Sequence, residues 1–268
     1  MLYRMVLFFF LAFSAVTEAE DTSFNALYNE FLKTYWQPSV VIHGIQATVF
    51  NYEAMKRDAV KPGSLFVRIE KKLAAMDPRA LGKKDKAKAF WINVYNFAAM
   101  RLVIDQYPVD SIRSMKISLL KYPWSKDAIV IGGQSYSLKQ IEKDILLAQF
   151  MDPRIVFAVS CAALSCPDRT NGAFVGAQLD AQLDGMIRTF LQNPAKGMSL
   201  NRPAKMLTLS WIFKKDQAIF TGYPGGIIGF VAPYLSSNEG EWIRNNRVNI
   251  KYFEHDWGLN DLALANVR

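Results

Sequence analysis

The sequence from residue 84 to residue 107, KDKAKAFWINVYNFAAMRLVIDQY, carries the longest helical pattern of the chain. Its apolar residues recur at the three- and four-residue spacing of a helix, and Pro108, which ends helices, follows directly. We expect the longest helix of the fold here. The residues predicted to face inward are Phe90, Trp91, Val94, Phe97, Ala98 and Leu102.

Two asparagines interrupt this apolar segment. Asn93 and Asn96 lie three residues apart, and therefore near one face of the helix. Buried amide groups need hydrogen-bond partners. We expect both side chains to tie the helix to a neighbouring loop, and we also include them among the residues of a candidate binding pocket.

Helical patterns precede and follow this segment. An amphipathic helix is predicted over residues 22–35, with Thr22 as its cap. A second helix is expected to begin near Pro62, because proline favours the first turn. Residues 137–140 form a capping box that opens another helix, and a further helix is expected over residues 177–192.

Several short segments have strand patterns. Gly132-Gly133 separates two of them and suits a hairpin turn, because glycine readily takes positive φ angles. The apolar run Ile155–Val159 has the length and composition of a buried strand. Val40–Tyr52 is expected to form a loop or a short strand. The remaining strands are expected at 198–200, 206–209 and 248–252.

The order of these elements indicates the fold class. Helices and strands follow one another without a repeating strand-helix-strand order, which favours an α+β fold. We predict a single domain in which about five to seven helices pack on a small mixed or antiparallel sheet. The hydrophobic content of 51% supplies a sizeable core and excludes intrinsic disorder as the main state.

The first nineteen residues have the pattern of a signal peptide. Arg4 is positive, Met5–Val16 is apolar, and residues 17–19 place small side chains at the usual positions before a cleavage site. The apolar run is shorter than the roughly 20 residues that span a bilayer, so an uncleaved anchor is the weaker alternative. We expect residues 20–268 to form one exported domain, in the periplasm rather than fully secreted, with no membrane span after signal removal.

The charge and the motifs that are missing restrict the partners. A formal net charge of +8 favours anionic surroundings such as lipid head groups or envelope polymers. We expect no nucleic-acid partner, because the basic residues are spread out and do not interleave with aromatic residues. Glycine-rich phosphate motifs do not occur, and we predict no cofactor. Nothing in the sequence indicates an oligomeric state.

Cys161 and Cys166 are the only cysteines of the chain. In an exported protein, a structural disulfide between them is one interpretation. The other makes one of them a nucleophile, which needs a nearby base. The chain has two histidines: His43 is expected in a loop, and His255 lies between Glu254 and Asp256, where an adjacent acid is expected to orient its imidazole. The spacing of these residues matches no familiar zinc motif, so we predict no metal site.

Arg154 lies beside Pro153, just before the apolar run that leads to the cysteines. Its charge requires a partner in such surroundings. We expect an ion pair with Glu142 or Asp168 and no catalytic duty.

Four segments stand out as a set, and the ending HDWGLN at 255–260 accompanies them. They are AFWINVYN at 89–96, SLKQIE at 137–142, DPRIVFAVSCAALSCP at 152–167 and LSWIF at 209–213. Together they resemble the bacterial branch of the DUF547 family, a domain of unknown function, over about residues 52–260. The resemblance implies an exported or envelope-associated domain and brings no agreed activity.

The same resemblance implies histidines near the paired cysteines, at positions where this chain has Lys143 and Val156. Valine cannot carry a proton, and lysine is a poor base unless it is desolvated. The resemblance therefore implies a retained scaffold with an altered site.

We predict a binding domain for a small molecule or an envelope component, with a degenerate family pocket near the cysteines. The alternative is a cysteine-dependent hydrolase or acyl transferase that uses Cys161 or Cys166 with His255. The residues predicted to line the pocket are Asn93, Asn96, Glu142 and Arg154.

Overall fold

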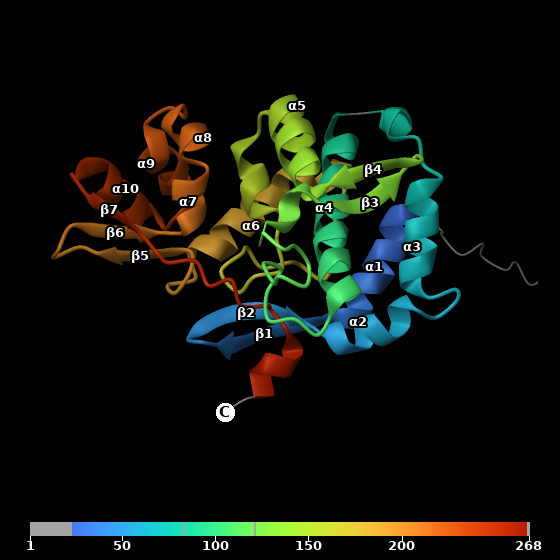
Figure 1. Ribbon diagram of the computed structural model, residues 1–268. Helices are drawn as coiled ribbons and strands as arrows, with labels where there is room; N and C mark the ends of the chain where they lie inside the picture. The colour runs from blue at the N-terminus through green and yellow to red at the C-terminus, as the bar shows by residue number, and fades with distance from the viewer. Residues whose placement is uncertain (1–22, 83, 121, 267–268) are drawn as a thin grey trace, which may run out of the picture.

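The computed structural model describes residues 23–82, 84–120 and 122–266. The predicted signal peptide, residues 1–19, lies outside them. Within the described residues, the chain forms ten α-helices and three small sheets (Figure 1). The α+β class is confirmed, but there are more than five to seven helices, and three sheets take the place of one. No helix in this part of the chain is both long and apolar enough to cross a membrane.

The helices differ widely in length. α4 is the longest with 23 residues, whereas α5 has three. A π-helical segment, Gln140–Leu147, leads directly into α5. The bounds are α1 (Phe24–Tyr35), α2 (Tyr52–Ala59), α3 (Leu65–Ala74), α4 (Lys84–Gln106), α5 (Ala148–Phe150), α6 (Leu179–Leu191), α7 (Trp211–Lys215), α8 (Gln217–Thr221), α9 (Gly226–Val231) and α10 (Ser237–Asn245).

The sheets are small. β1 and β2 form one antiparallel hairpin, and β3 and β4 form the other. In the second hairpin, Gly132 and Gly133 take φ angles of 58° and 78°, as predicted for its turn. In the third sheet, β6 pairs antiparallel with β5 and parallel with β7. The bounds are β1 (Trp36–Ile42), β2 (Ile45–Phe50), β3 (Asp127–Ile131), β4 (Gln134–Ser137), β5 (Met198–Asn201), β6 (Met206–Leu209) and β7 (Asn249–Tyr252).

α4 runs through the larger part of the molecule, with α3 on one side and the π-helical segment with α5 on the other (Figure 1). Every residue from Lys88 to Met100 is buried, so this stretch of the helix has no solvent-facing side. Its polar side chains must therefore find partners within the protein. The predicted long helix is confirmed, and it ends at Gln106.

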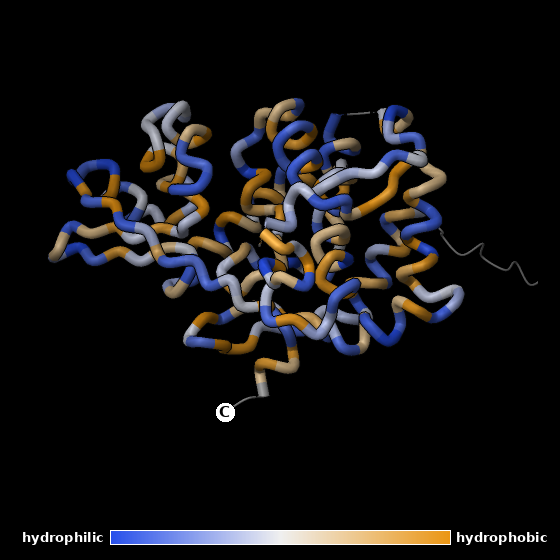
Figure 2. Tube along the Cα trace, in the orientation of Figure 1, coloured by the Kyte–Doolittle hydropathy of each residue, from blue (hydrophilic) through white to orange (hydrophobic). Residues whose placement is uncertain are grey.

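Two apolar clusters form most of the core. The larger one surrounds α4, and Phe31 contacts Phe66 and Phe97 within it at ring-centroid distances of 5.0 and 5.4 Å. The smaller one lies in the C-terminal part, where the rings of Phe157 and Phe213 are 5.3 Å apart. Hydrophilic residues gather on the outside, for example at the N-terminal end of α4 (Figure 2). The chain thus packs into two neighbouring apolar regions.

The predicted strand at Ile155–Val159 is wrong. Residues Pro153–Phe157 form a 3₁₀ turn, whose Asp152 cap accepts a hydrogen bond from the backbone of Arg154. Ile155 packs in the larger cluster and Phe157 in the smaller one. A run of apolar residues that is buried on all sides does not distinguish a strand from a helical turn.

Other boundaries also differ from the sequence prediction. The cap of α1 is Ser23, whose side chain accepts from the backbone of Ala26, and the predicted cap Thr22 lies outside the described residues. α3 begins at Leu65, after its cap Ser64, rather than near Pro62. The segment Val40–Tyr52 forms the end of β1, then β2 and the start of α2.

The remaining predicted elements are confirmed. The capping box is present, since Ser137 N donates to Gln140 Oε1 at 2.8 Å and Gln140 N donates to Ser137 Oγ at 3.2 Å. The helix predicted at 177–192 corresponds to α6, and the strands predicted at 198–200, 206–209 and 248–252 correspond to β5, β6 and β7.

The segment that follows β7 matters for the site. It leaves the third sheet and runs back along the middle of the molecule to the β1–β2 hairpin (Figure 1). On this path, Ala163 and Leu259 form an isolated antiparallel bridge, and Asn260 N donates to Ala162 O at 3.0 Å. The last part of the chain is therefore fastened to the loop that holds the cysteines.

Candidate functional site

The loop that holds the cysteines turns back on itself. Cys166 N donates to Ala163 O at 3.0 Å, and Ala162 takes a positive φ of 67°. This turn brings Cys161 N within 3.4 Å of Cys166 Sγ, to which it donates a hydrogen bond. Both cysteines are buried free thiols, so the disulfide is not formed in this structure.

The C-terminal segment positions His255 against this loop. Leu164 N donates to Gly258 O at 2.8 Å, and Ser165 N donates to Asp256 O at 3.2 Å. As a result, the two sulfurs and a ring nitrogen of His255 all lie within 4.8 Å of one another. The structure thus brings together Cys161, Cys166 and His255, the three residues that the sequence proposes for a cysteine-dependent enzyme.

The two sulfurs have different environments. Burial raises the pKa of Cys166, but the hydrogen bond from the Cys161 thiol and the nearby His255 imidazole outweigh it and hold that pKa well below its usual value. The hydrogen bond to Cys166, together with burial, holds the pKa of Cys161 well above its usual value. Cys166 is therefore the thiol that ionises first.

His255 is held by aromatic rings. Its ring centroid lies 4.2 Å from that of Trp257 and 5.1 Å from that of Trp211. Both of its ring nitrogens are buried, and neither has a hydrogen-bond partner among the described residues. The expected orientation by an adjacent acid, Glu254 or Asp256, is therefore wrong, and the Asp256 carboxylate lies instead 2.9 Å from Nδ1 of the exposed His43.

A cavity of about 320 Å³ lies beside this group. Trp211 and Trp257, which hold the His255 ring, also form part of its wall. The wall combines aromatic and charged side chains from the connection between α4 and β3, from the start of the π-helical segment, from α7 and from the segment after β7. The lining residues are Arg113, Tyr122, Trp124, Lys139, Glu142, Lys143, Trp211, Lys215 and Trp257.

Glu142 is the buried carboxylate of the cavity wall. Its Oε1 accepts from Lys215 Nζ at 2.9 Å and lies 3.0 Å from Lys143 Nζ, and its Oε2 accepts from the Tyr95 hydroxyl at 3.2 Å. Burial raises the pKa of the Glu142 carboxyl, but the charges of Lys215 and Lys143 outweigh it and hold that pKa below its usual value. Glu142 is therefore ionised and paired, which suits a residue that positions two lysines.

The asparagines of α4 have the structural role predicted for them. Asn93 donates to Phe174 O and accepts from Phe174 N, both at 2.9 Å. Asn96 donates to Ala158 O at 2.9 Å and accepts from Ser160 N at 2.8 Å. Neither is among the described residues that line the cavity.

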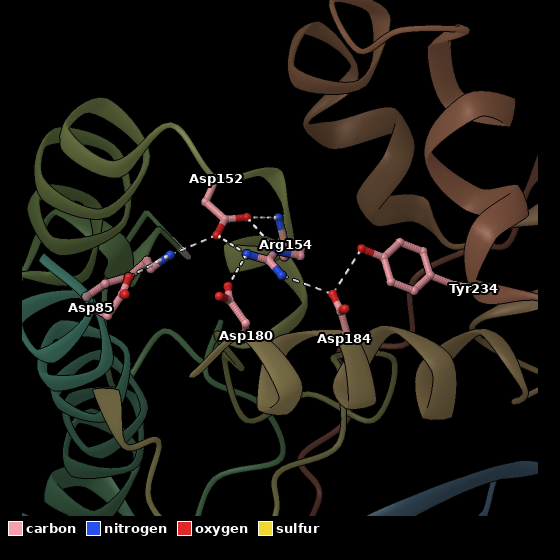
Figure 3. Close-up of polar contacts among 7 residues, drawn as sticks. Asp85, Asp152, Arg154, Asp180, Asp184 and Tyr234 are labelled. Atoms are coloured by element: carbon pink, nitrogen blue, oxygen red, sulfur yellow. Dashed lines mark hydrogen bonds and ion pairs between the residues drawn. The ribbon is translucent and has the colours of Figure 1, made fainter. Parts of the chain in front are cut away.

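Arg154 does not pair with Glu142 or Asp168. It binds three aspartates, Asp152, Asp180 and Asp184, at 2.9, 2.7 and 3.0 Å (Figure 3). Arg154 is not among the described residues that line the cavity. The two expected partners are already occupied, because Glu142 binds its two lysines and Asp168 binds Lys196 at 2.9 Å. This arginine ties the 3₁₀ turn to α6, which carries Asp180 and Asp184.

These features define an α+β domain in which a Cys-Cys-His group, formed by the buried Cys161 and Cys166 and the partly buried His255, adjoins an aromatic and cationic cavity. Residues 78–191 match the model of DUF547, a family of proteins of unknown function. The match supports membership of the DUF547 family, in agreement with the resemblance of the sequence segments. No curated protein and no solved structure is significantly similar to the chain.

The family match covers only part of the site. Both cysteines and Glu142 lie within residues 78–191, whereas Trp211, Lys215 and Trp257 lie after them. The sequence alone does not indicate these three residues as part of the site, because they come from segments that are distant in the chain. The sequence offers one signal for them. Trp211 and Trp257 lie inside the family-like segments 209–213 and 255–260, and Lys215 follows the first of these by two residues.

Proposed function

We propose that this protein binds a small organic anion with a flat apolar body in the cavity beside the cysteines. The observation that carries the proposal is the lining, in which three tryptophans and a tyrosine accompany four cationic side chains around about 320 Å³. Ligand pockets are mostly apolar and use a few polar groups to fix orientation. This volume is near the lower end of their usual range, roughly 300–1,000 Å³, and suits a small ligand.

The charges around the cavity favour an anion. Four positive side chains of the lining stand against two carboxylates, Glu142 of the lining and the adjacent Asp216, which binds Lys143 at 2.8 Å. Two positive charges therefore remain in excess and attract an anion. The side chains of Lys143 and Lys215 are 39% and 36% exposed, so their ammonium groups can reach a ligand as well as Glu142.

The tryptophans supply the apolar surface. The ring of Trp257 lies 5.6 Å from that of Trp124 and 5.7 Å from that of Trp211, measured between centroids. The guanidinium of Arg113 lies 4.8 Å from the Trp257 ring. Indole rings offer a large and rigid contact area. A flat ligand can pack on this surface while its negative charge reaches the lysines.

The alternative is a cysteine-dependent hydrolase or acyl transferase. It is favoured by the short separation between Cys166 and His255 and by the lowered pKa of Cys166. Access is the argument against it: the two cysteines are only 8% and 6% exposed, and neither is among the described residues that line the cavity. A nucleophile must reach its substrate, so we favour binding.

The binding proposal is tested with 2-naphthoate and its neutral counterpart 2-naphthamide. Three of the six tryptophans line the cavity, so intrinsic fluorescence reports its occupancy. We expect naphthoate to quench this fluorescence and to bind at least about tenfold more tightly than naphthamide, as one favourable charge contact of roughly 1.4 kcal/mol implies. Equal affinity for the two probes, or no saturable binding of either, contradicts the proposal.

Three variants locate the binding. Lys215→Met is expected to remove most of the preference for the anion, and Trp257→Ala is expected to weaken both probes. Lys251→Met, at an exposed lysine of β7, is the matched control and should leave both affinities unchanged. Release of a product from p-nitrophenyl acetate that Cys166→Ser abolishes would favour the cysteine-dependent enzyme instead.

A further inference from the structure

We infer that Cys161, Cys166 and His255 form the binding site of one zinc ion, with a fourth coordination position left for water or another small ligand. The inference goes beyond the proposed function and does not depend on it, because none of these three residues is among the described residues that line the cavity. The spacing of the cysteines and histidines along the chain gives no indication of such a site.

The ligand atoms already lie close together. The two sulfurs and a ring nitrogen of His255 are all within 4.8 Å of one another. Around a tetrahedral zinc ion, with Zn–S of about 2.3 Å and Zn–N of about 2.0 Å, neighbouring ligand atoms are separated by about 3.5–3.8 Å. Zinc binding therefore requires each pair of ligand atoms to approach by no more than about 1.3 Å.

The backbone holds the two ligand-bearing segments together. The cysteine loop and the C-terminal segment are joined by the bonds from Leu164 N to Gly258 O and from Ser165 N to Asp256 O. Asp256 N, next to His255, donates in return to Ser165 Oγ at 2.9 Å. The ligands are therefore brought together by the fold before any metal binds.

The imidazole is the observation that points to a ligand. Both nitrogens of His255 are buried and lack a hydrogen-bond partner among the described residues, which is costly for a polar group. Metal coordination gives one of these nitrogens a partner. Trp211 and Trp257 meanwhile pack against the ring, with centroids 5.1 and 4.2 Å from its own, and so restrict its orientation.

The charges of the filled site balance. Two thiolates and a neutral imidazole cancel the charge of Zn²⁺, and the two thiol protons are released to solvent. Lys196 is buried and donates from Nζ to Leu164 O at 3.1 Å, inside the cysteine loop. The same ammonium group is paired with Asp168 at 2.9 Å, so it fastens the cysteine loop without adding an unpaired charge beside the site.

The direct test uses the reduced, metal-free full chain, titrated with Co²⁺ and then with Zn²⁺. We expect a near-ultraviolet thiolate-to-cobalt absorption band that saturates at one Co²⁺ per chain and disappears on addition of one equivalent of Zn²⁺. A reduced protein that develops no such band and binds no Zn²⁺ overturns the inference. This measurement uses the unaltered chain, so it does not depend on the folding of any variant.

Variants then test the ligand set. Cys161→Ser, Cys166→Ser and His255→Ala are each expected to weaken zinc binding at least tenfold, with circular dichroism as the check on folding. His43→Ala removes the other histidine, which is exposed, and should leave the affinity unchanged. Unchanged zinc affinity in His255→Ala, or a loss in His43→Ala alone, contradicts the assigned ligands. Loss of zinc binding with intact naphthoate binding would leave the proposed function standing.

Discussion

The asparagines of α4 and the Cys-Cys-His group both place polar side-chain atoms in the interior, and they lie close together. Asn96 binds the backbone of Ala158 and Ser160, which leads directly into Cys161. The two sets differ in how well their polar atoms are satisfied. The amide nitrogen and oxygen of Asn96 both have partners, whereas neither nitrogen of His255 has one among the described residues.

This difference separates structural from functional burial. A buried polar group with complete hydrogen bonds stabilises one arrangement of the chain. A buried polar group without partners weakens the fold, and a bound ion, an ordered water or a catalytic role can account for it. We therefore interpret the asparagines as part of the scaffold and the Cys-Cys-His group as the site that the scaffold holds.

The largest expected effect is on the scaffold side of this comparison. Asn96→Leu keeps the approximate shape of the side chain but leaves Ala158 O and Ser160 N buried and unsatisfied. We expect the free energy of unfolding to fall by about 2–4 kcal/mol, as measured by urea denaturation. The exposed Asn245→Ala is the control, with an expected change within about 0.5 kcal/mol. A similar small change in Asn96→Leu would contradict its structural role.

A smaller effect, of opposite tendency, is expected at the site. His255→Phe retains a ring between Trp211 and Trp257 but removes the two unpartnered nitrogens. For the metal-free protein, we expect the free energy of unfolding to stay the same or rise by about 1 kcal/mol, since a buried polar group is lost without breaking a hydrogen bond. Thermal and urea unfolding measure it. A loss of 2 kcal/mol or more, on the order of that in Asn96→Leu, would remove the distinction between the two sets.

The smallest expected effect concerns Glu142, a buried group with full partners in the cavity wall. Its pKa in the folded protein lies below the unfolded value of about 4.3, so its stabilising contribution is complete above that pH and is lost as pH falls through the folded pKa. Glu142→Gln should therefore show a shallower loss of stability than the unaltered chain as the pH falls below about 4.3. Urea unfolding across this range measures the slope, with the exposed Glu241→Gln as the control. Equal slopes in Glu142→Gln and the unaltered chain would contradict the pairing with Lys143 and Lys215.

Local patterns were enough to predict much of the scaffold. α4, the hairpin around Gly132-Gly133 and the capping box at Ser137 depend on side-chain spacing and turn chemistry within a few residues. The run Ile155–Val159 was misassigned because burial on every side removes the periodicity that separates a strand from a helical turn.

The site was harder to predict because it is assembled from distant segments. Cys161, Cys166 and His255 were recognisable by their chemistry, but the bonds that join the cysteine loop to the C-terminal segment span more than ninety residues. The partners of Arg154 depend on where α6 packs. The tryptophans of the cavity lie at positions 124, 211 and 257, so they are at least 46 positions apart in the sequence and no local pattern contains two of them.

The central claim is that the Cys-Cys-His group is a metal-binding site held by a satisfied scaffold. X-ray absorption at the zinc K-edge, on the full chain loaded with one equivalent of Zn²⁺, tests it most directly. We predict a first shell with two sulfur atoms at about 2.3 Å and two nitrogen or oxygen atoms at about 2.0–2.1 Å, one of them an imidazole nitrogen. A shell of nitrogen and oxygen atoms alone would place the zinc elsewhere on the protein and contradict the account.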